Sequence, residues 1–170
     1  PSPGPRLAAM AAGLERQGAD VLVLACNTAH AWAADIRAAV GVPLLDMIAE
    51  TAAEAPRRRP GVRRVGVLAV DGCRAAGLYQ AALTAVDAEP VLLTLPAQAR
   101  FMRAVYAVKA GDAGPAVRAE MGALAAELVD AGAEVVISAC TEVPLVLSAE
   151  DVSAPLIDST DVLVTRTVQH

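Results

Sequence analysis

One strand-and-turn unit occurs twice in this chain of 170 residues, and this repeat restricts the possible folds more than any other feature. The stretch QGADVLVLACN aligns without a gap with the later stretch AGAEVVISACT. Gly18 precedes Cys26 by the same interval that separates Gly132 from Cys140. Each copy is followed by a Pro-Leu segment that ends in aspartate, VPLLD in the first and APLID in the second. A duplicated unit of this kind predicts two similar lobes.

Short apolar segments alternate with longer alanine-rich segments along the whole chain. The apolar segments predict strands at 20–25, 42–46, 64–70, 90–96, 133–139 and 154–158. The intervening segments predict helices at 6–17, 29–40, 48–55, 73–86, 99–111, 116–132 and 159–168. Strands separated by helices indicate an α/β fold with parallel, mixed-edge sheets flanked by helices.

We interpret this pattern as two pseudo-symmetric lobes with a cleft between them. The segment PRRRPGVRR, with two prolines, a glycine and five arginines, is the predicted linker. The first lobe then consists of residues 1–58 together with 156–170, and the second lobe of residues 59–155.

Composition excludes several classes of protein. The formal net charge is −5 and the chain has one Trp, two Tyr and one Phe, which argues against a nucleic-acid partner. No stretch has the roughly 18 uncharged apolar residues that a membrane span requires. The three cysteines form no CxxC pair and the two histidines lie far apart, so we expect no metal site and no disulfide framework. Free thiols favour a cytoplasmic protein, and the lack of a GxGxxG or P-loop motif in the right context favours one without a cofactor.

The repeated cysteines, Cys26 and Cys140, each end a buried strand, and ligands bind at the carboxyl ends of parallel strands. Asn27, Thr28 and Thr141 follow them and are suited to capping a helix. A thiol at a helix N-terminus has its pKa lowered from about 8.5 toward neutrality. A single free cysteine is more often a buried, inert side chain, but two at matched repeat positions favour function. Thiols on opposite walls of one cleft suit racemisation, in which one group removes a proton and the other returns one.

The sequence resembles the aspartate/glutamate racemase family, whose members racemise amino acids without pyridoxal phosphate. The motifs ACNTAH (25–30) and ACTEVPLVL (139–147) resemble the family's two catalytic-cysteine motifs. The segments VPLLDMIAETA, AGLYQ, VYAVKAG and PLIDST also match, in the family's order. Glutamate racemases of cell-wall synthesis typically have histidine where this chain has Glu142, so the resemblance is to the aspartate racemase branch.

The resemblance implies a role for seven residues. Cys26 and Cys140 would be the two acid/base groups, while Asn27, Thr28 and Thr141 would hold the α-carboxylate and ammonium groups of the substrate. Lys109 would pair with a substrate carboxylate, and Glu142 would bind the ammonium or orient Cys140. The substrate implied is aspartate first and glutamate second, and the assembly implied is a homodimer.

Several residues keep a second interpretation. Lys109 is either a solvated lysine at a helix end or a substrate ligand, and Glu142 is also an ordinary acid in the first turn of a helix. His30 either tunes the thiol of Cys26 or belongs to the surface or core. Cys73, where the family usually has threonine, is either a buried replacement or part of the cleft. The arginines of the predicted linker are either solvated or attract acidic substrates.

Two further departures from the family pattern leave other functions open. Family members begin with a βα unit carrying a Gly-rich turn, to which nothing here corresponds, so we expect a missing segment or a reduced pocket. Ala139 replaces a common glycine. The alternatives are another isomerase or a decarboxylase of the same superfamily acting on a small carboxylic acid, or a catalytically silent homologue that binds a ligand.

Overall fold

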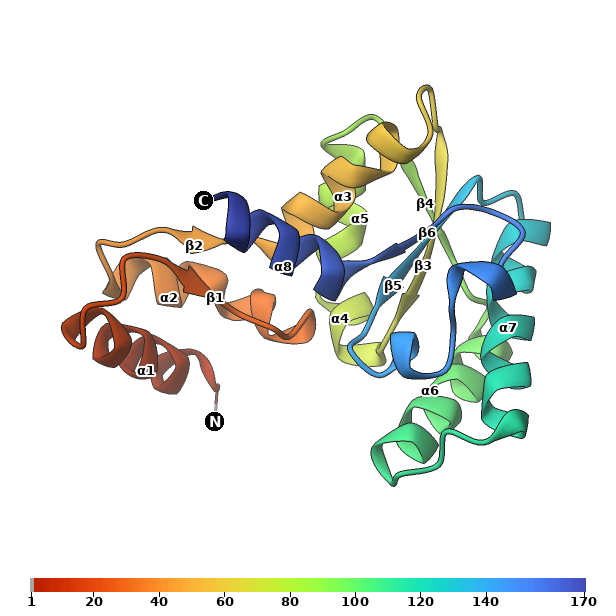
Figure 1. The fold of residues 1–170 in the computed structure, drawn as a ribbon, viewed down its shortest axis with the longest axis horizontal. Helices are drawn as coiled ribbons and strands as arrows, with labels where there is room; N and C mark the ends of the chain where they lie inside the picture. The colour runs from red at the N-terminus through yellow and green to blue at the C-terminus, as the bar shows by residue number, and fades with distance from the viewer. Residues whose placement is uncertain (1) are drawn as a thin grey trace.

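The computed structural model describes residues 2–170 and has an α/β architecture built on two parallel sheets (Figure 1). The larger sheet has the strand order β4-β3-β5-β6 and the smaller sheet pairs β1 with β2. These strands are β1 (Leu22–Val23), β2 (Leu44–Leu45), β3 (Arg64–Ala69), β4 (Glu89–Leu92), β5 (Val135–Ala139) and β6 (Leu156–Asp158). Each ladder between them is parallel. The α/β fold predicted from the alternation of segments is confirmed.

Helices cover both faces of the larger sheet. The α-helices are α1 (Gly4–Arg16), α2 (Ala33–Ala39), α3 (Met47–Arg58), α4 (Asp71–Ala75), α5 (Leu78–Thr84), α6 (Leu95–Lys109), α7 (Pro115–Asp130) and α8 (Ser159–Gln169), with 3-10 helices η1 (Thr28–Trp32), η2 (Val143–Leu145) and η3 (Ala149–Asp151). One core packs α6 and α7 against the sheet, and a second core packs α3, α5 and α8 against the other face. None of the described helices is long and apolar enough to cross a membrane.

The central strands β3 and β5 are buried on both faces, as their continuous apolar sequence predicts. Side chains of β5 alternate between the two cores, with Val136 in one and Ile137 in the other. Gly66 lies where α7 approaches β3 closely. A Cβ atom there would lie 3.0 Å from the Cβ of Ala133 and 3.1 Å from that of Leu128.

The duplicated unit is visible as two equivalent strand-to-helix junctions. Asp46 ends the VPLLD segment and caps α3, accepting hydrogen bonds from the N–H groups of Ile48 and Ala49. Asp158 ends the APLID segment and caps α8, accepting from Thr160 N–H. The two helices that follow, α3 and α8, pack side by side in the middle of the molecule (Figure 1).

The smaller lobe packs α1 and α2 together with β1 and β2 around its own small core, which includes Ala11, Leu22 and Ile36. The strand β6 is hydrogen-bonded to β5 of the larger sheet, and α3 contributes Ile48, Ala52 and Ala55 to a core of that sheet. The lobe boundaries drawn from the sequence, 1–58 with 156–170 and 59–155, stay a prediction.

Several element boundaries differ from the sequence-based prediction. The strand predicted at 20–25 is limited to β1, the strand predicted at 90–96 ends at Leu92 before α6 begins at Leu95, and the helix predicted at 29–40 begins as the 3-10 helix η1.

Two further differences, in α3 and at Gly77, have a clear cause. The predicted linker begins at Pro56, but α3 continues through it to Arg58. Proline in the last turn removes one backbone donor, and the burial of Ala52 and Ala55 against the sheet holds this turn helical. The single helix predicted at 73–86 is instead α4 and α5, because Gly77 between them has a positive φ of 67°.

Candidate active site

The two repeated strand ends meet at one small pocket of about 80 Å³. The seven residues selected from the sequence all line it: Cys26, Asn27, Thr28, Lys109, Cys140, Thr141 and Glu142. Cys26 follows β1 and Cys140 follows β5. Lys109, the last residue of α6, adds a cation from the larger lobe. The structure therefore brings together residues that are distant in sequence, while their individual roles stay predictions.

Cys140 is bonded to an acid–base pair within the pocket. Its thiol donates to Glu142 Oε2 at 2.9 Å, and Lys109 Nζ lies 3.3 Å from Glu142 Oε1. Thr141 Oγ1 donates to the same carboxylate at 3.2 Å. Glu142 and Lys109 therefore contact each other beside Cys140, and neither side chain is simply solvated.

The pKa of Cys140 is shifted in the direction opposite to the one expected from the sequence. Burial, reinforced by the Glu142 carboxylate, raises the pKa of the Cys140 thiol to about 12. The expected lowering by a helix N-terminus is wrong here, because the following helix η2 has only three residues and the thiol is buried. Burial also acts to raise the pKa of Glu142, but the hydrogen bonds from Cys140 and Lys109 hold that pKa below its ordinary value. Cys140 is therefore a protonated thiol at neutral pH.

Cys26 has a different environment, since it is exposed at the end of β1. The turn around it is held by His30, which is buried. Met47 N–H donates to His30 Nε2 at 3.1 Å, so Nδ1 carries the ring proton and donates to the Cys26 carbonyl at 2.9 Å. His30 thus contacts the backbone of Cys26 through one ring nitrogen and the first residue of α3 through the other.

Asn27 is buried and has both polar ends of its side chain bonded within the protein. Tyr79 Oη donates to Asn27 Oδ1 at 2.6 Å, and Asn27 Nδ2 donates to Ser159 Oγ at 3.1 Å. Neither Tyr79 nor Ser159 is among the site residues predicted from the sequence. The signal that marks them is their position in AGLYQ and PLIDST, two of the segments that resemble the family.

The remaining candidates lie outside the pocket lining. Cys73 is buried in the core behind the site, where burial, with a smaller contribution from Cys26, raises its pKa to about 12. Arg57 and Arg58 pair with Glu54, and Arg59 pairs with Glu134. Among residues 2–170 there is no group of three or more His, Cys, Asp or Glu side chains placed to hold a metal ion.

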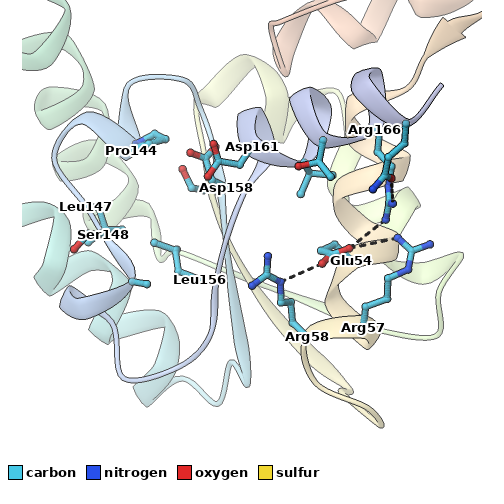
Figure 2. Close-up of a pocket in the computed structure, with 15 residues that line it drawn as sticks. Glu54, Arg57, Arg58, Pro144, Leu147, Ser148, Leu156, Asp158, Asp161 and Arg166 are labelled. Atoms are coloured by element: carbon cyan, nitrogen blue, oxygen red, sulfur yellow. Dashed lines mark hydrogen bonds and ion pairs between the residues drawn. The ribbon is translucent and has the colours of Figure 1, made fainter.

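A larger groove of about 820 Å³ runs along α3, α8 and the edge strand β6 (Figure 2). Its described lining includes none of the seven selected residues. Figure 2 shows Arg57, Arg58 and Arg166 turned toward Glu54, with which all three form ion pairs. Because neither thiol lines the groove, whereas Cys26 and Cys140 both line the smaller pocket, the chemistry identifies the smaller pocket as the candidate site.

Relatives of known class match most of this chain. It is 31% identical over 155 residues to the broad specificity amino-acid racemase RacX of Bacillus subtilis (strain 168), covering 91% of this chain and 66% of that protein. It is 37% identical over 136 residues to a glutamate racemase of Pseudomonas aeruginosa PAO1, covering 78% of this chain and 49% of that protein. The chain thus spans about half to two thirds of the length of these relatives.

Solved structures match the fold closely. An aspartate racemase of Picrophilus torridus superposes with a TM-score of 0.84 at 25% identity, covering 99% of this chain and 69% of that one. An aspartate racemase homologue of Pyrococcus horikoshii OT3 gives a TM-score of 0.83 at 27% identity, covering 98% and 73%. The family described as Asp/Glu/Hydantoin racemase matches residues 1–167. This match and the identity to RacX show that the chain belongs to the Asp/Glu/Hydantoin racemase family.

Proposed function

We propose that this protein racemises an acidic amino acid without a cofactor, aspartate first and glutamate second, by a two-thiol mechanism. The observation that carries the proposal is the convergence of Cys26 and Cys140, from matched repeat positions, on one small pocket. Membership of the family and the racemase activities named for its relatives support the same reaction class.

The two thiols differ in a way that suits their tasks. Cys140 is protonated at neutral pH and is the acid that gives a proton to the substrate Cα. Cys26 is the base that removes the α-proton from the opposite face, so one proton leaves and one arrives in each turnover. In the reverse direction the roles exchange, and Cys140 becomes the base. The carboxylate of Glu142 raises the basicity of that thiolate, while the ammonium of Lys109 stabilises its charge.

Lys109 and the two threonines are the proposed substrate ligands. Among the lining residues, Lys109 supplies the positive charge that an acidic substrate needs, and it is about half exposed beside the pocket. Thr28 and Thr141 are partly buried at the two strand ends, where they can hold the α-carboxylate and ammonium groups. Asn27 is a further proposed ligand of these groups from the sequence, although both ends of its side chain are bonded to Tyr79 and Ser159.

The test is α-proton exchange in D2O followed by NMR, with L-aspartate and L-glutamate supplied separately. We expect exchange and racemisation with L-aspartate, and loss of racemisation in both Cys26→Ala and Cys140→Ala. Cys73→Ala is the matched control, since Cys73 is not among the pocket residues, and it should retain activity. Racemisation that survives in Cys140→Ala would exclude the two-thiol mechanism.

Thiol alkylation separates this proposal from the alternatives. A one-thiol isomerase or decarboxylase would need only one of the two cysteines, and a silent homologue would show no protection of its thiols by aspartate. We further propose that the protein is a homodimer in the cytoplasm. Its small-molecule ligand is the amino-acid substrate. Light scattering in solution checks the dimer.

A further inference from the structure

Buried polar side chains gather directly behind Cys26. They are Asn27, His30, Thr51, Tyr79 and Ser159, none more than 6% exposed, and we name them the junction cluster. They come from the turn after β1, from η1 and from the helices α3, α5 and α8. The cluster therefore lies where the turn that carries Cys26 meets the helices packed on the larger sheet.

Hydrogen bonds connect this cluster in two chains. In the first, Tyr79 donates to Asn27 and Asn27 donates to Ser159, which ties the residue after Cys26 to α5 and α8 at once. In the second, His30 links the Cys26 carbonyl to Met47 N–H. Thr51 Oγ1 donates to the carbonyl of the same Met47 at 2.6 Å.

Packing alone does not require these polar groups. Apolar contacts are non-directional and leave the position of the turn free to adjust, whereas each buried hydrogen bond fixes a distance and a direction. Removal of one partner leaves a buried donor or acceptor unsatisfied, so a fully bonded cluster specifies a single arrangement. Asn27 bonds two different helices, and its side chain therefore fixes the adjacent Cys26 in two directions.

We propose that Tyr79 and Ser159 are positioning residues, which act through Asn27 to hold Cys26 at the separation from Cys140 that two-thiol racemisation needs. The inference rests on the proposed function and adds to it the parts of the protein that set the geometry of the thiols. A displacement of about 1 Å at a reacting group can cost about 100-fold in rate, so the hydroxyl of Tyr79 affects turnover without contacting the substrate.

The first test compares Tyr79→Phe with Tyr106→Phe. Each change removes one hydroxyl, but Tyr79 is 1% exposed and bonded to Asn27, whereas Tyr106 is 62% exposed on α6. We expect kcat to fall about 10- to 100-fold in Tyr79→Phe with a smaller change in KM, because Lys109, Thr28 and Thr141 still bind the substrate while the position of Cys26 is lost. We expect no change in Tyr106→Phe. Wild-type kcat in folded Tyr79→Phe would overturn the proposal.

A second measurement needs no turnover. Dibromobimane becomes fluorescent when it bridges two thiols, and peptide mapping identifies the bridge between Cys26 and Cys140. We expect a lower bridging yield in Tyr79→Phe and in Ser159→Ala than in the wild type and in Tyr106→Phe. Ser159→Ala tests the other end of the chain of bonds, so the outcome does not depend on how one variant folds.

The two readouts separate this inference from the proposed function. If the wild-type protein fails to racemise either acid, the proposed function is wrong, and the bridging yield still tests the positioning. Equal yields in the wild type, Tyr79→Phe and Ser159→Ala would overturn the positioning whatever the activity.

Discussion

At the scale of single residues, the two strand-end cysteines have unlike surroundings despite their matched sequence positions. Cys26 is exposed three residues after the end of a two-residue strand, and Cys140 is buried directly after a five-residue strand in the larger sheet. Glu142 adds to the difference because its carboxylate accepts the S–H bond of Cys140. The repeat therefore places two equal groups, and the burial and the carboxylate neighbour of Cys140 keep that thiol protonated at neutral pH.

The change Glu142→Gln tests this assignment. Removal of the carboxylate charge should lower the pKa of Cys140 from about 12, while burial, the larger cause, keeps the pKa above its ordinary value. The pH dependence of alkylation at Cys140, read by peptide mass spectrometry, measures the shift. Cys73 is the internal reference, since burial also raises its pKa to about 12, with a smaller contribution from Cys26 and none from a carboxylate. An unchanged profile at Cys140 would show that Glu142 has no electrostatic effect on the thiol.

At the scale of secondary-structure elements, replacement of glycine by alanine should have opposite effects on stability at two positions, Gly66 and Gly122. In Gly66→Ala the new Cβ would meet Ala133 and Leu128 at 3.0–3.1 Å, and overpacking of this kind costs about 1–3 kcal/mol of unfolding free energy. Gly122 lies inside α7, and no other part of the described chain comes within 4 Å of the place that a Cβ would take there. Gly122→Ala should therefore stabilise the protein by about 1 kcal/mol. Urea unfolding of both variants measures the difference, and a stabilised Gly66→Ala would mean that α7 shifts freely on β3.

Asp46 and Asp158 cap equivalent helices of the repeat, but their contributions to the unfolding free energy should depend on pH in opposite directions. Burial of Asp46 acts to raise its pKa, but the bond from Arg37 and the α3 N–H groups outweigh it and the pKa is lowered. The charged form of Asp46 therefore stabilises the fold above the ordinary pKa of 3.8, and this stabilisation is lost as the pH falls through the lower folded value. Burial raises the pKa of Asp158, so its contribution is present below 3.8 and is lost as the pH rises through the folded value.

Asparagine caps a helix about as well as aspartate but carries no charge. Asp46→Asn should therefore lower the unfolding free energy at neutral pH, and Asp158→Asn should leave it unchanged or raise it. Urea unfolding at neutral pH and again below the ordinary carboxyl pKa measures both effects, and the effect of Asp46→Asn should shrink at the lower pH. Equal effects of the two variants at neutral pH would contradict the assigned directions.

At the scale of the whole molecule, the pocket joins two packed units with separate cores. One wall comes from the smaller lobe through Cys26 and Thr28, and the other from the larger lobe through Lys109 and Cys140. A ligand that contacts both walls binds only the native arrangement, so its binding energy adds to the stability of the whole chain.

L-Aspartate should therefore raise the unfolding free energy, by about 2.7 kcal/mol at a concentration 100 times its Kd. Chemical unfolding with and without the amino acid measures the gain, and L-alanine, which lacks the second carboxylate, is the control ligand. The gain should be reduced in Lys109→Gln because the cation of the pocket is lost. Equal stabilisation by L-alanine would contradict recognition of an acidic side chain.

The sequence by itself determined the alternation of strands and helices and the parallel sheets, which follow from local periodicity. The repeat also predicted that Cys26 and Cys140 follow equivalent strands, at the carboxyl ends where ligands bind. Those two strands belong to different sheets, so the packing of the two lobes is what brings the cysteines to one pocket. The sequence motifs also selected seven of the residues that line the pocket, whose individual roles stay predictions.

Only the tertiary structure decided how those residues are held. Asn27 bonds Tyr79 and Ser159, which lie 52 and 132 positions away, and no periodicity in the sequence encodes such a pairing. The raised pKa of Cys140 and the continuation of α3 past Pro56 also result from tertiary packing, which buries the thiol and the last turns of α3. Burial and side-chain contact depend on which elements pack together, and in these places they outweigh the local helix signals.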